Sequence, residues 1–262
     1  MNPDAIDLYM SHGIDLTNEP LEIAVCSQHM NGGADVDTDW QTELKGLYVI
    51  GEAAGTYGPR RPGGSALSAG QIGALRAADH VALSVRKGVS LDSSAKLAMS
   101  EVAEKTIEFF NTALANKGKA TIDEFLLKTR HDMTSFSAHI RELPMLDSLT
   151  EECLNRAETI ANEVSLSSKD DLVSLVKARD TLLAQSAICH AIKSAANAGS
   201  YGGALLRDEE KNNLPADNSW DSLKLITKLE NGVLSSFTKK LNPIPQPNNW
   251  FENVWREYRL RG

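Results

Sequence analysis

The side chains best suited to chemistry lie in one short region near the start of the chain. His29 precedes a pair of glycines, Glu52 follows the apolar run 47–50, and Arg61 lies in a loop with two further glycines. An imidazole can donate or accept a hydrogen bond, a carboxylate accepts bonds from hydroxyls, and a guanidinium pairs bidentately with a carboxylate. Together with the glycine-rich loop, these groups indicate a cradle for a cofactor.

Local sequence patterns predict which elements hold these groups. The run 47–50 contains tyrosine and valine between glycines, which predicts a strand buried on both faces. Glu52 would then stand at the carboxyl end of this strand, where open α/β sheets bind their ligands. Behind Gly63 and Gly64, a helix rich in small residues is expected to begin at Ser65. A helix start that follows glycines is a favourable site for negative charge.

The rest of the chain changes character near residue 90. Alternating apolar residues predict that 21–50 is mostly sheet, after a short helix at 4–12. From 90 to 200 glycine and proline almost vanish, and apolar residues recur at helical spacing. We expect a bundle of four helices there, and the Asn-Gly pair at 231–232 predicts a β-hairpin. The helices are expected at about 93–116, 121–144, 148–164 and 169–198, with a short aromatic and basic helix at 250–261.

The fold class is therefore expected to be α/β, followed by a mainly helical domain with a β-hairpin. The 262 residues carry a net charge of −8, which argues against a nucleic-acid surface. The three cysteines are dispersed and lack metal-ligand spacing, which favours reduced thiols and a cytoplasmic protein. No apolar run approaches the roughly 20 residues of a membrane span, and the start lacks the apolar core of a signal peptide.

Two kinds of site are not expected. Aspartates at 35, 37 and 39 match the start of a calcium loop, but Trp40 and Gly46 stand where glycine and glutamate are needed, so we predict no metal. The chain also has neither a G-x-G-x-x-G segment nor a P-loop, the usual elements that bind phosphates. The residues alone therefore indicate only part of a cofactor cradle.

Three segments, at 29–33, 46–52 and 61–65, resemble in order and spacing those of the succinate dehydrogenase, fumarate reductase and L-aspartate oxidase flavoproteins. Members carry a His-x-x-Gly-Gly-like segment, Gly-Leu-Tyr-x-x-Gly-Glu, and an Arg-x-Gly-Gly-Asn-like loop before a small-residue helix. The resemblance implies that this chain is the C-terminal half of such a protein. Residues 1–20 would be the tail of the capping domain, 21–90 the C-terminal part of the FAD-binding domain, and 91–262 the helical C-terminal domain.

The resemblance also implies roles for single residues. Glu52 would bind hydroxyls of the FAD ribityl chain or ribose, and Arg61 and His29 would bind a substrate carboxylate near flavin N5. Gly63 and Gly64 would let the backbone approach the cofactor closely. Backbone N–H groups at the flavin pyrimidine edge would come from Ser65, Ala66 and Leu67.

The chain departs from the family pattern in its loops. Tyr57 to Arg60 stands where members have a His before Gly and an Asn before the Arg, Ser65 replaces an Asn, and an expected Arg is missing after Ser200. The implied function is hydride transfer between flavin N5 and a small carboxylated substrate. The implied partners are the missing N-terminal half or an electron-transfer subunit. The alternatives are a non-catalytic remnant, a subunit that needs a separate G-x-G-x-x-G chain, and a purely helical interaction module.

Overall fold

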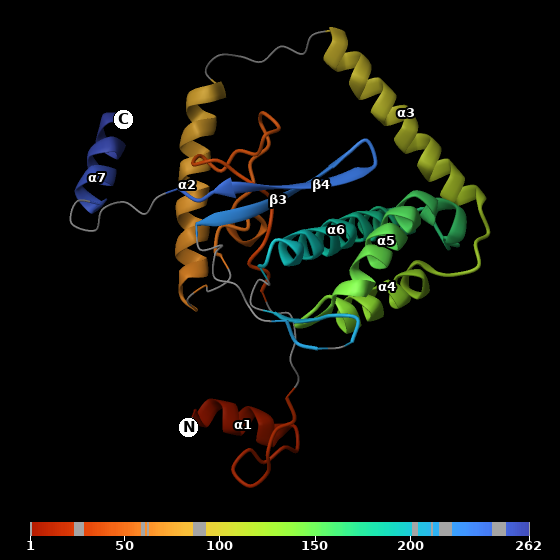
Figure 1. Ribbon diagram of the computed structural model, residues 1–262, viewed down its shortest axis with the longest axis horizontal. Coiled ribbons are helices and arrows are strands. Elements are labelled where there is room, and N and C mark those ends of the chain that lie inside the picture. Colours follow the sequence, from red (N-terminus) through yellow and green to blue (C-terminus); the bar gives the residue numbers. More distant parts are fainter. Residues whose placement is uncertain are drawn as a thin grey trace. The chain divides into compact units, whose positions relative to one another are not determined.

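The computed structural model divides the chain into two compact units, Met1–Gly88 and Val89–Gly262 (Figure 1). The structure describes residues 2–23, 29–58, 61, 63–85, 93–200, 204–210, 212–214, 222–242 and 250–261. Cys26 and Arg60 lie outside these residues.

The described residues of the first unit form two α-helices and a single helical turn. Helix α1 spans Pro3–Ser11, the 3-10 turn η1 spans Gly51–Ala53, and helix α2 spans Ser65–Val85. The side chain of Asn2 caps α1 by accepting a hydrogen bond from the Asp4 N–H, and Gly13 follows the helix with a φ of +82°. The short helix expected at 4–12 is therefore confirmed, because both of its end signals are local.

The sheet expected over 21–50 is wrong for the residues that the structure describes. These residues contain only the isolated bridges Gly33–Ala54 and Gln41–Tyr48. The apolar run 47–50 is also not a buried strand, since Leu47 is 48% and Ile50 is 42% exposed. A strand needs a neighbour along its length, and here the bonds stay local, as when the Thr42 N–H donates to the Leu47 carbonyl. The alternating pattern belongs to a looped segment.

The small residues of α2 allow other parts of this unit to pack closely on the helix. A Cβ added at Gly73 would lie 2.6 Å from Nε1 of Trp40, and one added at Gly70 would lie 3.8 Å from Cα of Gly51. Farther along α2, His80 Nδ1 lies 2.7 Å from the hydroxyl of Tyr48. The surface of α2 around Gly70 and Gly73 therefore packs against η1 and the Trp40 ring. This packing fixes the position of Glu52, which belongs to η1.

The second unit is built on two long helices. Helices α5 (Leu143–Glu163) and α6 (Asp171–Asn197) pack against each other, and α4 (Ile122–Phe136) contacts both (Figure 1). Helix α3 (Ser93–Ala115) packs on α5. A capping box begins α4, with reciprocal bonds between Thr121 and Glu124. The fully buried side chains of this core include Leu146, Cys153, Ile160, Leu175, Leu182 and Cys189.

Two helix boundaries in this unit differ from expectation, the end of the helix expected over 121–144 and the start of the one expected over 148–164. The helix expected over 121–144 is shorter, because α4 ends at Phe136, where the Ser137 N–H bonds to the Met133 carbonyl. Strand β1 (Ile140–Glu142) follows and pairs in parallel with β2 (Leu205–Arg207). Helix α5 then begins at Leu143, with Pro144 in its first turn, where a proline costs no hydrogen bond. Pro144 therefore lies at the start of α5, and not at the end of the preceding helix as expected.

The hairpin is confirmed in detail. Strands β3 (Leu223–Glu230) and β4 (Val233–Lys240) pair antiparallel, with Glu230 opposite Val233. Asn231 and Gly232 both have positive φ, 51° and 79°, as a two-residue type I′ turn requires. The hairpin packs on α6, and the expected helix at 250–261 is α7 (Trp250–Arg261).

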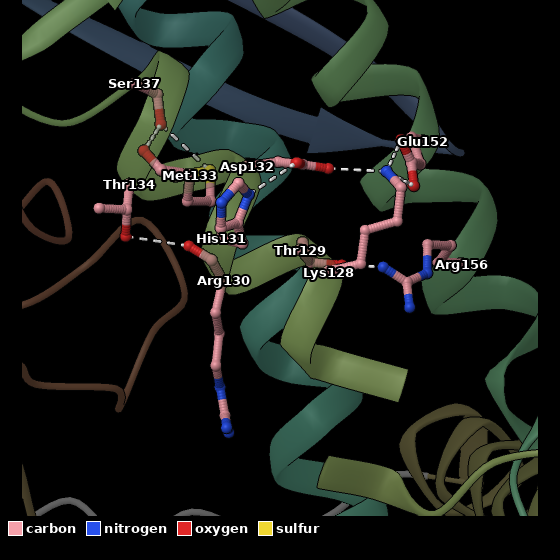
Figure 2. A network of polar contacts seen from close by, with 10 residues as sticks. All are labelled: Lys128, Thr129, Arg130, His131, Asp132, Met133, Thr134, Ser137, Glu152 and Arg156. Atoms are coloured by element: carbon pink, nitrogen blue, oxygen red, sulfur yellow. Dashed lines mark hydrogen bonds and ion pairs between the residues drawn. The ribbon is translucent and has the colours of Figure 1, made fainter. Parts of the chain in front are cut away.

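A network of polar contacts joins α4 to α5 (Figure 2). Lys128 Nζ lies 2.7 Å from Asp132 Oδ2 and 2.8 Å from Glu152 Oε1. The bond to Asp132 is the main reason that the pKa of Lys128 is raised, and it lowers the pKa of Asp132. Beside them, Arg156 donates to the Thr129 hydroxyl and to the Phe125 carbonyl, with its guanidinium 4.0 Å from the Phe125 ring centroid. Each of these charged side chains has a hydrogen-bond partner within the protein. We therefore interpret the network as a structural connection between α4 and α5.

We predict that the two buried thiols react very slowly. Cys153 and Cys189 have no exposed surface, and burial raises their pKa values to about 12 and about 11. From an ordinary value of 9.0, the thiolate fraction of Cys153 at neutral pH falls about a thousandfold. In a Cys26→Ser variant, an alkylating reagent should label these thiols in the native chain at least a hundred times more slowly, on the order-of-magnitude scale, than in denaturant. Equal labelling rates would contradict the packing of this core.

The same two thiols make the free energy of unfolding depend on pH in the alkaline range. A raised pKa in the folded state means that the unfolded chain loses the proton first as pH rises. The stabilisation is complete below pH 9.0 and falls as pH rises toward the folded value, by about 1.4 kcal/mol per pH unit for each thiol.

Candidate functional site

His29 and Glu52 lie together in the first unit. Nε2 of His29 is 3.5 Å from Oε2 of Glu52, and Oε1 of Glu52 accepts a hydrogen bond of 2.8 Å from the Met30 N–H. The His29 side chain is 16% exposed and that of Glu52 is 50% exposed. One carboxylate oxygen of Glu52 therefore faces the His29 ring, and the other accepts the hydrogen bond from the next backbone N–H. About half of the Glu52 side chain remains exposed to solvent.

Two glycines explain why these residues meet. The Ala34 N–H donates to the Ala53 carbonyl at 2.8 Å, so the segment after His29 runs directly against η1. A Cβ added at Gly33 would lie 2.3 Å from the Ala53 oxygen, and one added at Gly55 would lie 2.2 Å from the Gly33 nitrogen. No real side chain fits such distances, and Gly55 also has a φ of +61°. The backbone contact depends on glycine on both sides.

The second nitrogen of the His29 ring also faces an oxygen. Nδ1 lies 3.0 Å from Oδ1 of Asn31, opposite the nitrogen that faces Glu52. A neutral imidazole donates from one nitrogen only, whereas an imidazolium donates from both. The ring is thus held through both of its nitrogens, which restricts its orientation.

Tyr57 connects His29 to the remaining predicted residues. The Tyr57 and His29 rings meet edge to face, with centroids 5.0 Å apart and planes at 63°. The Arg61 guanidinium lies over the same tyrosine ring, 6.0 Å from its centroid, and Nη1 of Arg61 donates to the Gly63 carbonyl at 2.9 Å. The Tyr57 hydroxyl donates to the Ala66 carbonyl at 3.2 Å. The imidazole, the guanidinium and the first turn of α2 are therefore grouped around one ring.

The loop glycines are exposed, and the first turn of α2 behind them is half-buried at Ser65 and Ala66 and exposed at Leu67. A Cβ added at Gly63 or Gly64 would meet nothing within 4 Å, so packing within the chain does not require glycine there. Ser65 to Leu67 form the first turn of α2, and Leu67 is 79% exposed. The first N–H groups of an α-helix have no partner within the helix. This end of α2 therefore presents donors beside an open loop.

The structure brings together all the residues that were expected to form the site, although their roles stay predictions. It adds two that sequence reasoning missed, Tyr57 and Asn31. Asn31 carried no signal, because an asparagine in a loop is an ordinary turn residue, and Tyr57 was visible only as a departure from the family loop. The arrangement combines a guanidinium for a carboxylate, an oriented imidazole, a half-exposed carboxylate for hydroxyls, and a helix end for negative charge.

The described residues contain neither of two further features. No helix among them has the length and apolar character to cross a membrane. In the same parts of the chain, no three His, Cys, Asp or Glu side chains are grouped as metal ligands would be.

Comparison with known proteins finds partial relatives. No model of a protein family matches the chain. A fumarate reductase (CoM/CoB) subunit of Methanothermobacter marburgensis is 37% identical over 70 residues, which is 26% of this chain and 13% of that protein. The L-aspartate oxidase of Streptomyces coelicolor is 33% identical over 82 residues, 30% of this chain and 14% of the relative. L-aspartate oxidase 2-a of Nicotiana tabacum is 33% identical over 81 residues, 29% of this chain and 13% of the relative.

Solved structures match over most of the chain. A quinol-fumarate reductase with menaquinol molecules gives a TM-score of 0.75 at 16% identity, covering 94% of this chain and 43% of that one. A variant of the E. coli quinol fumarate reductase FrdA gives 0.71 at 15% identity, covering 94% and 42%. The chain therefore spans less than half the length of these solved chains. Its mainly helical fold, with one parallel and one antiparallel pair of strands in the described residues, resembles part of theirs.

Proposed function

Because this chain is homologous in part to the fumarate reductases and L-aspartate oxidases, we propose that it forms the C-terminal portion of an FAD-dependent oxidoreductase. The substrate is a small carboxylated molecule. One observation carries the proposal: His29, Glu52 and Arg61 are gathered beside the N-terminal end of α2, linked through Tyr57. The expected resemblance to these proteins is confirmed at the level of partial homology.

In this proposal Arg61 and His29 bind the substrate carboxylate. A guanidinium presents a planar fork of donors that matches a carboxylate, and the Tyr57 ring and the Gly63 carbonyl hold that fork in place. Both nitrogens of His29 face oxygens, of Glu52 and of Asn31, so in this proposal Nε2, at 3.5 Å from Glu52, exchanges that contact for the substrate carboxylate. Two donors at a set spacing select the position of the bound acid as well as its charge.

The residues also fit a flavin. The half-exposed carboxylate of Glu52 can accept bonds from ribityl or ribose hydroxyls, and the α2 N–H groups can donate to the pyrimidine edge. A helix N-terminus stabilises nearby negative charge by about 0.3–2 kcal/mol, which favours a reduced, anionic ring. The flavin would supply the redox chemistry, hydride transfer at N5, and the chain would supply orientation and electrostatics.

We predict that the chain binds FAD weakly through this cradle, since it has no G-x-G-x-x-G segment to hold the pyrophosphate. Titration of the isotope-labelled chain with FAD should shift the NMR signals of Glu52 and of Ser65 to Leu67, while hairpin signals stay in place. Glu52→Gln should weaken the shifts, and Glu43→Gln, an equal loss of charge on an exposed residue of the same unit, should not. The proposal would be contradicted if neither the Glu52 signal nor the signals of Ser65 to Leu67 shifted. It would also be contradicted if Glu52→Gln and Glu43→Gln weakened the shifts equally.

A second candidate function is a subunit that works only with a separate chain carrying the G-x-G-x-x-G half. The exposed apolar residues of α2 favour it, because Ile72, Leu75 and Leu83 are each about half exposed. A helix that is apolar on both sides is typical of one buried on both sides. A neighbouring reading frame that opens with a strand, G-x-G-x-x-G and a helix would distinguish this candidate from a non-catalytic remnant.

A further inference from the structure

Tyr57 contacts three separate parts of the candidate site. Its ring meets the His29 ring edge to face at 5.0 Å, its face carries the Arg61 guanidinium at 6.0 Å, and its hydroxyl bonds to the Ala66 carbonyl in the first turn of α2. The residue is half-buried. The tyrosine ring is thus a direct physical link between the imidazole and the guanidinium.

The geometry of these contacts restricts motion. A tyrosine has only two side-chain dihedral angles, and its hydroxyl bond to Ala66 anchors the far end of the ring to a long helix. A guanidinium within about 6 Å of a ring face is attracted to it, so the ring orients the long and flexible side chain of Arg61. The same ring closes one side of His29. One rigid group thus sets the spacing between guanidinium and imidazole.

We propose that Tyr57 is a positioning residue, which sets the distance and orientation of Arg61 and His29 for a carboxylate ligand. The inference rests on the proposed function for the nature of that ligand, and on geometry alone for the positioning. A preorganised pair of donors loses less freedom on binding than a mobile pair. Removing the ring should therefore weaken carboxylate binding without removing either donor.

The test uses the full chain and three variants. Tyr57→Leu removes the ring, Tyr57→Phe keeps the ring and removes the hydroxyl, and Tyr48→Leu is the matched control. Tyr48 belongs to the same unit but faces His80, with a hydroxyl-to-Nδ1 distance of 2.7 Å and ring centroids 5.7 Å apart. NMR signals of the His29 ring protons and of the Arg61 Nε–H report position, and titration with succinate reports carboxylate binding.

Tyr57→Leu should shift the His29 signals, speed solvent exchange of the Arg61 Nε–H, and raise the Kd for succinate about tenfold. Tyr57→Phe keeps the ring but loses the bond that anchors it to Ala66, so its Kd for succinate should rise by only about twofold to threefold. Tyr48→Leu should shift the His80 and Gln41 signals and leave those of His29 and Arg61 in place. Unchanged His29 and Arg61 signals in Tyr57→Leu, or equal losses in Tyr57→Phe, would overturn the inference.

Two further outcomes are distinguishable. If the unmodified chain does not bind succinate, the proposed substrate class fails, and the His29 and Arg61 signals still decide the positioning role. If Tyr57→Leu does not fold, nuclear Overhauser contacts between the Tyr57 and His29 rings in the unmodified chain decide it. Their absence would overturn the inference.

Discussion

Replacing Gly33 with alanine is expected to break the candidate site apart. The added methyl would lie 2.3 Å from the Ala53 oxygen and 2.4 Å from the Gly55 nitrogen, and both are backbone atoms that cannot rotate away. The two segments would have to separate, which disrupts the Ala34–Ala53 hydrogen bond and moves His29 from Glu52. Overpacking of this kind costs about 1–3 kcal/mol or more. The thermal unfolding of the first unit should shift accordingly, and the His29 NMR signals should move.

Gly32→Ala is the matched control, one residue earlier on the same segment. A Cβ there would meet nothing within 4 Å, and Gly32 has no positive φ. This variant should unfold at the temperature of the unmodified chain or slightly above it, because alanine restricts the unfolded chain more than glycine does. If the two variants behave alike, the close backbone contact between residues 33 and 55 does not exist in solution.

If the proposed function holds, Arg61→Ala is expected to remove turnover from this chain combined with a separate chain that carries the G-x-G-x-x-G half, while leaving flavin bound. The substitution deletes the proposed carboxylate partner but none of the groups proposed to hold the cofactor. Loss of a charged, bidentate interaction with the reacting molecule corresponds to a fall in kcat/KM of about a thousandfold. Steady-state kinetics and the flavin absorbance of the same preparation measure the two effects separately.

Two further substitutions control this result. Arg61→Lys keeps the charge and loses the fork, so its kcat/KM should lie between those of the alanine variant and the unmodified enzyme. Arg130→Ala removes an arginine of α4 whose side chain is 56% exposed, and it should leave turnover unchanged. Full activity in Arg61→Ala would remove this residue from the proposed mechanism.

Most helices were predictable because their signals are local. The capping box at Thr121, the glycine after α6 and the long apolar periodicity each lie within a few residues of the element that they define. The hairpin was predictable for the same reason, since Asn231 and Gly232 alone favour the turn that aligns its strands. Local chemistry of this kind does not depend on what the rest of the chain does.

The strands outside the hairpin were not predictable in this way. The run 47–50 has strand-like residues but no partner along its length among the described residues, so it lies in a loop. Strand β1 shows the opposite case, since its partner β2 is more than sixty residues away. A strand of three residues, such as β1, is too short to show the alternation of apolar and polar residues by which a strand is recognised in a sequence. Pro144 suggests the end of one helix in the sequence, whereas it lies at the start of another.

For the candidate site, the family resemblance identified the residues, and the structure shows which of them contact one another. The spacing between His29 and Glu52 does not itself indicate that they meet, since that depends on the backbone contact at Gly33. Tyr57 was visible only as a departure from the family loop. Its contacts with His29 and Arg61 depend on the path of the whole segment 29–61, which no local pattern encodes.

The pairing of β1 with β2 has a consequence for how the second unit can evolve. Ile140 lies beside Leu205, so the chain arrives at helices α5 and α6 and departs from them at the same edge. A segment whose two ends are neighbours can be lengthened, duplicated or transplanted into another host protein with little disturbance to the host backbone. The β1–β2 pairing thus brings the two ends of the helical pair together, while α3, α4 and the hairpin pack on that pair.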